Sequence, residues 1–293
     1  MDGAIVVDKP QGWTSHDVVG KVRRLAKTKK VGHLGTLDPI ATGVLPLVIN
    51  RATRLAQFYT RSDKVYEAVV RFGFSTDTYD RVGEATSPAT EPALDREELE
   101  RALARFRGPF MQAPPPVSAK KVDGVRAYKL ARQKIAVELA PAPVEVYELQ
   151  LLEVSGCEAA LRAHCSGGTY MRAIAHDLGL ALGCGAHLRD LRRTTSGEFS
   201  IGQARTIAEL ERLSAEDRFE EAVIPAAQLL PDIPAVRVEE MVVHHIRQGR
   251  NFPVSPFRAQ KPGRYVKAVS REGELVAIGE AVLPNLYHPA VVL

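Results

Sequence analysis

One carboxylate, Asp38, stands in a stretch of about fifteen residues, 32–46, that otherwise holds glycine, proline, threonine, histidine and apolar residues. Three glycines and two prolines disfavour a helix or a central strand and predict a shaped loop. Pro39 restricts Asp38 to extended geometry, and no lysine or arginine within the stretch neutralises its charge. A single acid on a rigid loop is what a nucleophile or a general base requires.

A structural interpretation competes with the catalytic one. Aspartate before proline is common in turns, and aspartate is a frequent helix cap. Taken by itself, the Asp38-Pro39 pair favours this structural interpretation, so the choice depends on the surrounding sequence.

The whole stretch resembles the active-site loop of the TruB family of tRNA pseudouridine synthases, whose motif reads G-H-x-G-x-L-D-P-x-A-x-G-x-L-P. Further segments resemble the same family in the same order, between residue 4 and about residue 203. One departure is Gly167, where many members carry lysine, and it predicts a weaker phosphate contact. The resembling segments are 7–15, 64–73, 76–80, 115–120 with Gly124 and Tyr128, and 168–172.

The resemblance implies a catalytic group of three residues. Asp38 either attacks the sugar of a uridine or acts as a base at its 2′ position. Both roles require the carboxylate to be ionised inside a dry cleft. A guanidinium beside the carboxylate favours its ionised form, and Arg172 is the family's partner for that purpose. Tyr66 has the right character to stack on the target base.

The resemblance also implies a set of substrate-binding residues. The target uridine lies inside a folded T-loop and must be extruded before the reaction, which costs a few kcal/mol. His33 is expected to fill the vacated space, and Tyr170 is expected to contact the base. The remaining expected contributors are Asp80 in a supporting hydrogen-bond network, Lys120 in the cleft lining, and Lys9 and Pro10, which hold the cleft together.

Without the resemblance, each of these residues has a plainer explanation. An isolated arginine such as Arg172 is more often a surface charge on a helix, and a tyrosine in a strand, such as Tyr66, is more often part of the core. A lone histidine in a glycine-rich loop, such as His33, is often only a polar turn residue.

Composition narrows the class of protein. The chain has 293 residues, of which 45% are hydrophobic and 25% charged, as in a soluble globular protein, and this length predicts two domains. No stretch approaches the roughly 20 apolar residues of a membrane span, and the N-terminus lacks a signal-peptide pattern, so a cytoplasmic location is expected. Three cysteines without CxxC spacing predict neither disulfides nor a zinc site, and we expect no metal and no cofactor.

The charge balance suits a polyanionic partner. The net charge is +4, and basic residues gather in clusters near the Asp38 loop. Each cluster alone is typical of a solvated face, but several together favour RNA contact, because neutralising phosphates needs many cations. The clusters are 21–30, 120–121 and 189–193.

Hydrophobic periodicity predicts the elements that position these residues. Strands are expected at 4–9, 44–49, 64–74, 144–151, 158–165, 264–269 and 274–282, with a hairpin tip at 271–273. Helices are expected from a cap at Ser15, from a cap at Asp95 to Gly108, over 170–182, and twice within 207–228. Residues 113–116 predict a stiff extended segment.

This order of elements predicts an α+β fold with a mainly antiparallel sheet, because no regular βαβ rhythm appears. The resemblance implies the pseudouridine synthase fold, a mixed sheet with a central RNA-binding cleft. We expect a catalytic domain at 1–231 and a small β-rich domain, resembling a PUA RNA-binding domain, at 232–293.

The resulting functional hypothesis is a bacterial-type, stand-alone isomerase that converts uridine 55 of the tRNA T-loop to pseudouridine and acts as a monomer. Alternatives are a guide-RNA-dependent member of the same family and a non-catalytic RNA-binding or tRNA-folding protein. A glycoside hydrolase normally needs paired carboxylates, and the Asp38 stretch offers one.

Overall fold

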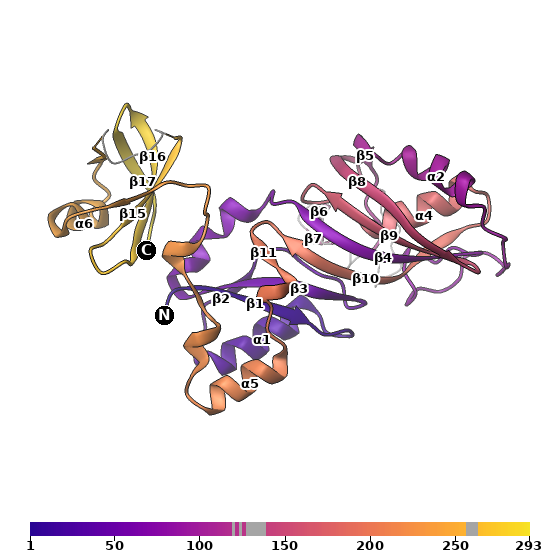
Figure 1. Cartoon of the computed structure of the whole chain (residues 1–293), viewed down its shortest axis with the longest axis horizontal. Coiled ribbons are helices and arrows are strands. Elements are labelled where there is room, and N and C mark those ends of the chain that lie inside the picture. Colours follow the sequence, from indigo (N-terminus) through magenta and orange to yellow (C-terminus); the bar gives the residue numbers. More distant parts are fainter. Residues whose placement is uncertain (119–120, 123–124, 127–138, 256–262) are drawn as a thin grey trace.

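The computed structural model describes residues 1–118, 121–122, 125–126, 139–255 and 263–293, and one large sheet dominates them (Figure 1). Its strand order is β12-β1-β3-β10-β4-β9-β8-β5, with β2 added to β3 and β11 to β10. In the described part of this sheet β3 and β10 run parallel and the other pairs antiparallel, which confirms the mixed, mainly antiparallel prediction. The strands are β1 (Gly3–Lys9), β2 (Val31–His33), β3 (Ala41–Ile49), β4 (Lys64–Phe72), β5 (Gly108–Gln112), β8 (Ala142–Ser155), β9 (Glu158–Cys165), β10 (Ala186–Ser196), β11 (Phe199–Ser200) and β12 (Ile224–Pro225).

Helices cover the two ends of this sheet (Figure 1). Near β1, α1 (Ser15–Leu25) and α5 (Ile207–Ala215) contact each other, while α4 (Met171–Ala181) packs on β10 and β4, and α2 (Arg96–Ala104) on β8. Asp95 caps α2 as predicted, but α1 is capped by Thr14 in a capping box with Asp17, not by Ser15. The predicted end at Gly108 is also wrong, since α2 ends at Ala104 and Gly108 starts β5. Shorter elements are η1 (Asn50–Tyr59), η2 (Ile201–Gln203), η3 (Phe219–Ala222), η4 (Ala226–Gln228), and the pair β6 (Lys121–Val122) and β7 (Val125–Arg126).

The predicted loop over residues 32–46 is too long, because only residues 34–40 lie outside strands. Gly43 lies within β3 at φ +96°, and a Cβ there would stand 2.2 Å from the Arg193 carbonyl oxygen, so glycine lets β3 approach β10. Pro46 falls between the β3 residues that pair with β10 and those that pair with β2. The Pro46 carbonyl accepts a hydrogen bond from the amide of Leu34, beside β2. Proline has no backbone N–H to donate, and at this position the neighbouring strand does not require one.

The central strand β10 was not predicted, because the sequence of residues 189–193 is typical of a basic surface cluster. Arg193 is instead fully buried, whereas Arg192 points outward and pairs with Asp8 (2.8 Å). Arg189 pairs with Asp190 and Glu158. Alternation along a strand explains the difference, because neighbouring side chains point to opposite faces.

The C-terminal part forms a separate sheet in the order β13-β15-β16-β17-β14, which confirms a β-rich tail (Figure 1). It has its own apolar core, and it contacts η1 through Arg54, whose Nη1 donates to the Val292 carbonyl (2.6 Å), and through the rings of Phe58 and Tyr265. The boundary at residue 232 and the likeness to a PUA domain stay predictions. The elements are β13 (Ala235–Arg237), α6 (Glu240–Arg247), which the sequence analysis missed, β14 (Phe252–Pro253), β15 (Tyr265–Val269), β16 (Leu275–Leu283) and β17 (Leu286–Val292).

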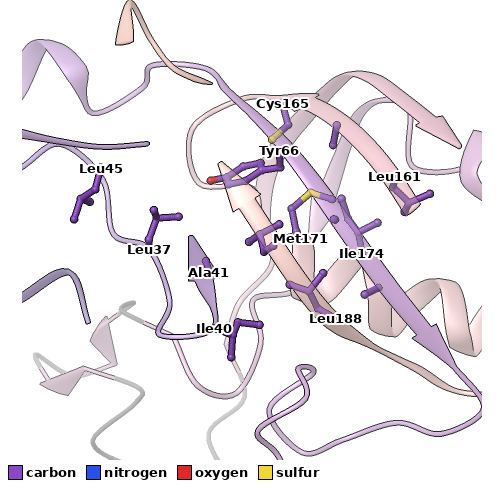
Figure 2. Packing of buried hydrophobic residues seen from close by; sticks show 14 of the residues in the cluster. Leu37, Ile40, Ala41, Leu45, Tyr66, Leu161, Cys165, Met171, Ile174 and Leu188 are labelled. Atoms are coloured by element: carbon purple, nitrogen blue, oxygen red, sulfur yellow. The ribbon is translucent and has the colours of Figure 1, made fainter. Parts of the chain in front are cut away.

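An apolar cluster lies beneath the Asp38 loop (Figure 2). Leu37 and Ile40, on either side of Asp38-Pro39, are both buried in it, so two apolar side chains anchor the loop. Opposite them lie Tyr66 of β4, Met171 of α4 and Leu188 of β10. No helix among the described residues combines the length and apolar composition needed to cross a membrane.

Candidate active site

A cavity of about 470 Å³ opens between the Asp38 loop, η1, β4, β10 and the start of α4. Five of the predicted site residues line it: His33, Asp38, Tyr66, Tyr170 and Arg172. They come from segments up to 139 residues apart in the chain, with His33 and Arg172 at the extremes. The structure therefore brings together side chains that the sequence only suggested as a group.

Arg172 is the central cation of this site. It lies in the first turn of α4, is only 4% exposed, and its Nε donates to Asp38 Oδ2 at 2.9 Å. Its Nη1 and Nη2 donate to the carbonyls of Thr78 (3.0 Å) and Val117 (2.9 Å). The guanidinium is thus fixed by three segments, and the half-buried Asp38 side chain lines the cavity beside it.

Asp80 lies behind this pair and is almost completely buried. Its Oδ1 accepts from Thr78 Oγ1 (2.7 Å) and the Val82 amide (3.1 Å), and its Oδ2 lies 3.8 Å from Arg172 Nε. The second carboxylate is therefore placed to orient the arginine, which agrees with the supporting position expected for it.

The Asp38 loop is fastened to the end of β1 and to the start of α1. The buried Ser15 hydroxyl donates to the Leu37 carbonyl (3.0 Å) and accepts from the Leu37 amide (2.8 Å). Lys9, fully buried, donates from Nζ to the carbonyls of Trp13 (2.6 Å), Pro10 (3.0 Å) and Pro39 (3.5 Å). Lys9 and Pro10 are thus placed to hold the loop from one side, and Ser15 joins them.

Lys9 provides a pH-dependent prediction. Burial lowers its pKa to about 8, although the nearby Asp38 charge opposes the fall. Between pH 8 and 10.5 the unfolded chain keeps a proton that the folded chain releases, so the Lys9 contribution to the free energy of unfolding rises with pH. Urea unfolding of wild type and Lys9→Met across this window should show the difference between them growing in favour of wild type. A difference that stays constant would contradict the prediction.

Arg193 fastens the loop from the other side, and the sequence analysis missed this role. Its Nε donates to the Val44 carbonyl (2.7 Å), Nη2 to Gly35 (3.0 Å) and Nη1 to Thr36 (3.3 Å). The signal is the local alternation expected of a strand at 191–193, where Leu191 and Arg193 are buried and Arg192 between them is partly exposed.

Two tyrosines form the aromatic part of the cavity. Tyr66 on β4 is almost completely buried, and Tyr170 is the residue at the N-cap position of α4. Burial raises the pKa of both phenols, so both rings are uncharged at neutral pH. The buried Gln112, not foreseen from sequence, holds Tyr170 by exchanging two hydrogen bonds with its backbone (2.8 and 3.0 Å). Both rings therefore suit contact with a flat, neutral group such as a nucleobase.

His33 ends β2 at the cavity wall, where its ring makes an edge contact with His16 at 5.9 Å between ring centres. Lys120 lies outside the described residues. Gly167 packs closely on the backbone of Thr60 and Arg61, where an added Cβ would stand 3.1–3.2 Å from their atoms. A lysine at this position would thus need the 60–61 backbone to shift. In the described part of the chain, no group of three or more His, Cys, Asp and Glu residues could hold a metal ion.

Comparison with known proteins agrees with this geometry. Residues 23–171 match a family model described as the N-terminal domain of TruB family pseudouridylate synthases, and residues 172–231 match the C-terminal domain of tRNA pseudouridylate synthase B. A protein named tRNA pseudouridine synthase B from Solibacter usitatus (strain Ellin6076) is 68% identical over 293 residues, covering 100% of both chains. One with the same name from Aquifex aeolicus (strain VF5) is 40% identical and covers 96% of each chain.

Two solved structures share the fold. The first, a Cbf5-Nop10-Gar1 complex, has a TM-score of 0.72 at 29% identity and covers 96% of this chain and 78% of that one. The second, an H/ACA RNP bound to a substrate RNA containing 2′-deoxyuridine, has a TM-score of 0.71 at 28% identity, with coverage of 96% and 78%. The expected pseudouridine synthase fold is confirmed. With the Asp38 loop, the arginine of α4 and two family models in agreement, this chain belongs to the TruB family of pseudouridylate synthases.

Proposed function

We propose that this chain isomerises uridine 55 in the T-loop of tRNA to pseudouridine, alone and without guide RNA or cofactor. The observation that carries the proposal is the Asp38–Arg172 ion pair (2.9 Å) at a cavity that also contains two neutral tyrosines. The full-length similarity to proteins named tRNA pseudouridine synthase B supports tRNA as the substrate.

The reaction fits a site built around a single carboxylate. It replaces the bond from C1′ to N1 of the base with one from C1′ to C5 and moves one proton from C5 to N1, so no redox step occurs. Asp38 either attacks the sugar or takes a proton at its 2′ position, and the hydrogen bond from Arg172 Nε orients the carboxylate. Tyr66 stacks on the base, and the buried cluster beneath the loop keeps Asp38 in place while the base turns.

The target base must leave its stack to reach this cavity. Extrusion costs a few kcal/mol, and a side chain that occupies the vacated space offsets part of this. His33 lies on the same short segment as Asp38, at the cavity wall, and is suited to this task. Tyr170 provides the second contact to the base, and Asp80 keeps Arg172 in position.

The direct test is incubation of the purified chain with an unmodified tRNA transcript, followed by mapping of pseudouridine in the T-loop. Product at position 55 without added guide RNA is the expected result. Product only with a guide would support the guide-dependent alternative. Tight binding without any product would support a non-catalytic RNA-binding protein.

We also propose that residues 232–293 form an RNA-binding domain that binds the tRNA at a place outside the cavity. Arg247, the last residue of α6, and Arg250, three residues after it, are exposed, and neither forms an ion pair with any described residue. Reversing both charges should raise the Kd for tRNA about tenfold and flatten its salt dependence, because each lost phosphate contact lowers the slope by about one. The rate at saturating tRNA should stay unchanged.

The matched control reverses two exposed arginines at the far end of the sheet, Arg101 and Arg105, which changes net charge equally. Binding measured across a salt series separates a local contact from a general charge effect. Equal weakening by both double variants would contradict an RNA-binding role for the tail.

A further inference from the structure

Tyr79 has an unusual backbone conformation next to the site. Its φ is +63°, in the left-handed region that glycine adopts freely and a bulky side chain avoids at a cost of about 1–2 kcal/mol. Such strain persists only where the surroundings impose it, and it concentrates at functional sites.

The Tyr79 ring stacks face to face on the ring of His176, with ring centres 3.7 Å apart and planes 8° from parallel. His176 lies on α4, one turn after Arg172, and its Nδ1 is buried without a hydrogen-bond partner among the described residues. Burial lowers the pKa of His176, so the stacked ring is neutral at pH 7. The strained backbone of Tyr79 and the unpaired nitrogen of His176 are both unfavourable, and they occur in the same ring contact.

The neighbours of Tyr79 connect this contact to the catalytic pair. The Thr78 carbonyl accepts from Arg172 Nη1 (3.0 Å), and the Asp80 carboxylate lies 3.8 Å from Arg172 Nε. The Tyr79 carbonyl accepts from the Leu188 amide of β10 (3.0 Å), which ties the turn to the central sheet. The left-handed residue thus lies between two neighbours that both approach the same guanidinium.

We propose that Tyr79, by stacking on His176, is a positioning residue for the Arg172–Asp38 pair. The stack joins the 76–80 turn to α4 one helical turn from Arg172. The turn that carries acceptors of the guanidinium is therefore packed against the helix that carries the guanidinium. Without the stack the Tyr79 ring no longer fixes the turn to α4, and the acceptors of Arg172 on the turn then move relative to the guanidinium. The activity readout of this proposal rests on the proposed function.

The experiment compares Tyr79→Gly, His176→Ala, the double variant and Tyr79→Phe. Glycine adopts φ +63° without strain, so Tyr79→Gly removes the stack while permitting the turn. We expect Tyr79→Gly and His176→Ala each to lower the single-turnover rate on tRNA about 10- to 100-fold, with Kd within about twofold. The double variant should be no slower than either single variant, and Tyr79→Phe should keep the wild-type rate.

A second readout does not depend on activity. The Arg172 Nε–H signal in ¹⁵N-edited NMR, assigned by its loss in Arg172→Lys, reports the bond to Asp38 and should shift or broaden in Tyr79→Gly but not in Tyr79→Phe. Tyr147→Ala serves as the control, because it removes a tyrosine that contacts a different histidine, His164, without contact to Arg172. A wild type that makes no pseudouridine would refute the proposed function, while the NMR signal would still decide the positioning role.

Three results would overturn the positioning role. They are an unchanged rate and an unchanged Arg172 signal in Tyr79→Gly, a Tyr79→Phe variant as slow as Tyr79→Gly, and additive effects in the double variant. A fall in Tm with a wild-type rate would mean that the stack only stabilises the fold.

Discussion

Asp38→Asn is expected to reduce the single-turnover rate of pseudouridine formation by at least about 10³-fold, equivalent to about 4 kcal/mol. Asparagine keeps the size of the side chain and still offers an oxygen to Arg172 Nε, but it can neither attack the sugar nor take a proton. Because Asp38 is held through Leu37 and Ile40, the loop should stay folded and the Kd for tRNA should stay within about twofold.

The matched control is Asp190→Asn, which removes a half-buried carboxylate that pairs with Arg81 and Arg189. Its rate should remain within about threefold of wild type, since a partly exposed ion pair contributes roughly 0–1 kcal/mol. Rate assays and filter binding on the same transcript distinguish the outcomes. If Asp38→Asn loses tRNA binding as strongly as it loses rate, the residue is structural and the proposed chemistry is wrong.

Arg193→Met is expected to lower the free energy of unfolding by on the order of 3 kcal/mol, the largest stability effect among the site residues. Arg193 is fully buried, and its removal leaves the carbonyls of Gly35, Thr36 and Val44 without their donor. Since two of these carbonyls precede Asp38 by two or three residues, the rate should fall as well.

The neighbouring Arg192 provides the comparison, because its side chain is 39% exposed and pairs with Asp8. Arg192→Met should change the free energy of unfolding by less than about 1 kcal/mol, and urea unfolding without RNA measures both variants. Equal effects of the two substitutions would show that the buried bonds of Arg193 do not hold the loop.

Much of the local structure follows from sequence pattern. Alternation predicts β4, β8, β9, β15 and β16, and helical periodicity with a cap at Asp95 predicts α2. The strand β10 was missed because its charged residues, gathered at 189–193, resemble a surface cluster, and because three of its buried positions are polar: His187, Arg193 and Ser196. α6 was missed as well, because the tail had been assigned strands and turns alone.

The sequence alone determined the chemistry-bearing group: the acid at Asp38, the loop that carries it, and the family to which the Arg172 and Tyr66 segments belong. These three features depend on residue type and local spacing, which can be read directly from the sequence. Only the tertiary structure decided which groups hold the acid and its loop, because Arg172 reaches the carboxylate, and Arg193 and Lys9 reach the loop carbonyls, from distant segments. A buried cation needs several acceptors at once, and which carbonyls converge on it is fixed by how strands pair and not by their order.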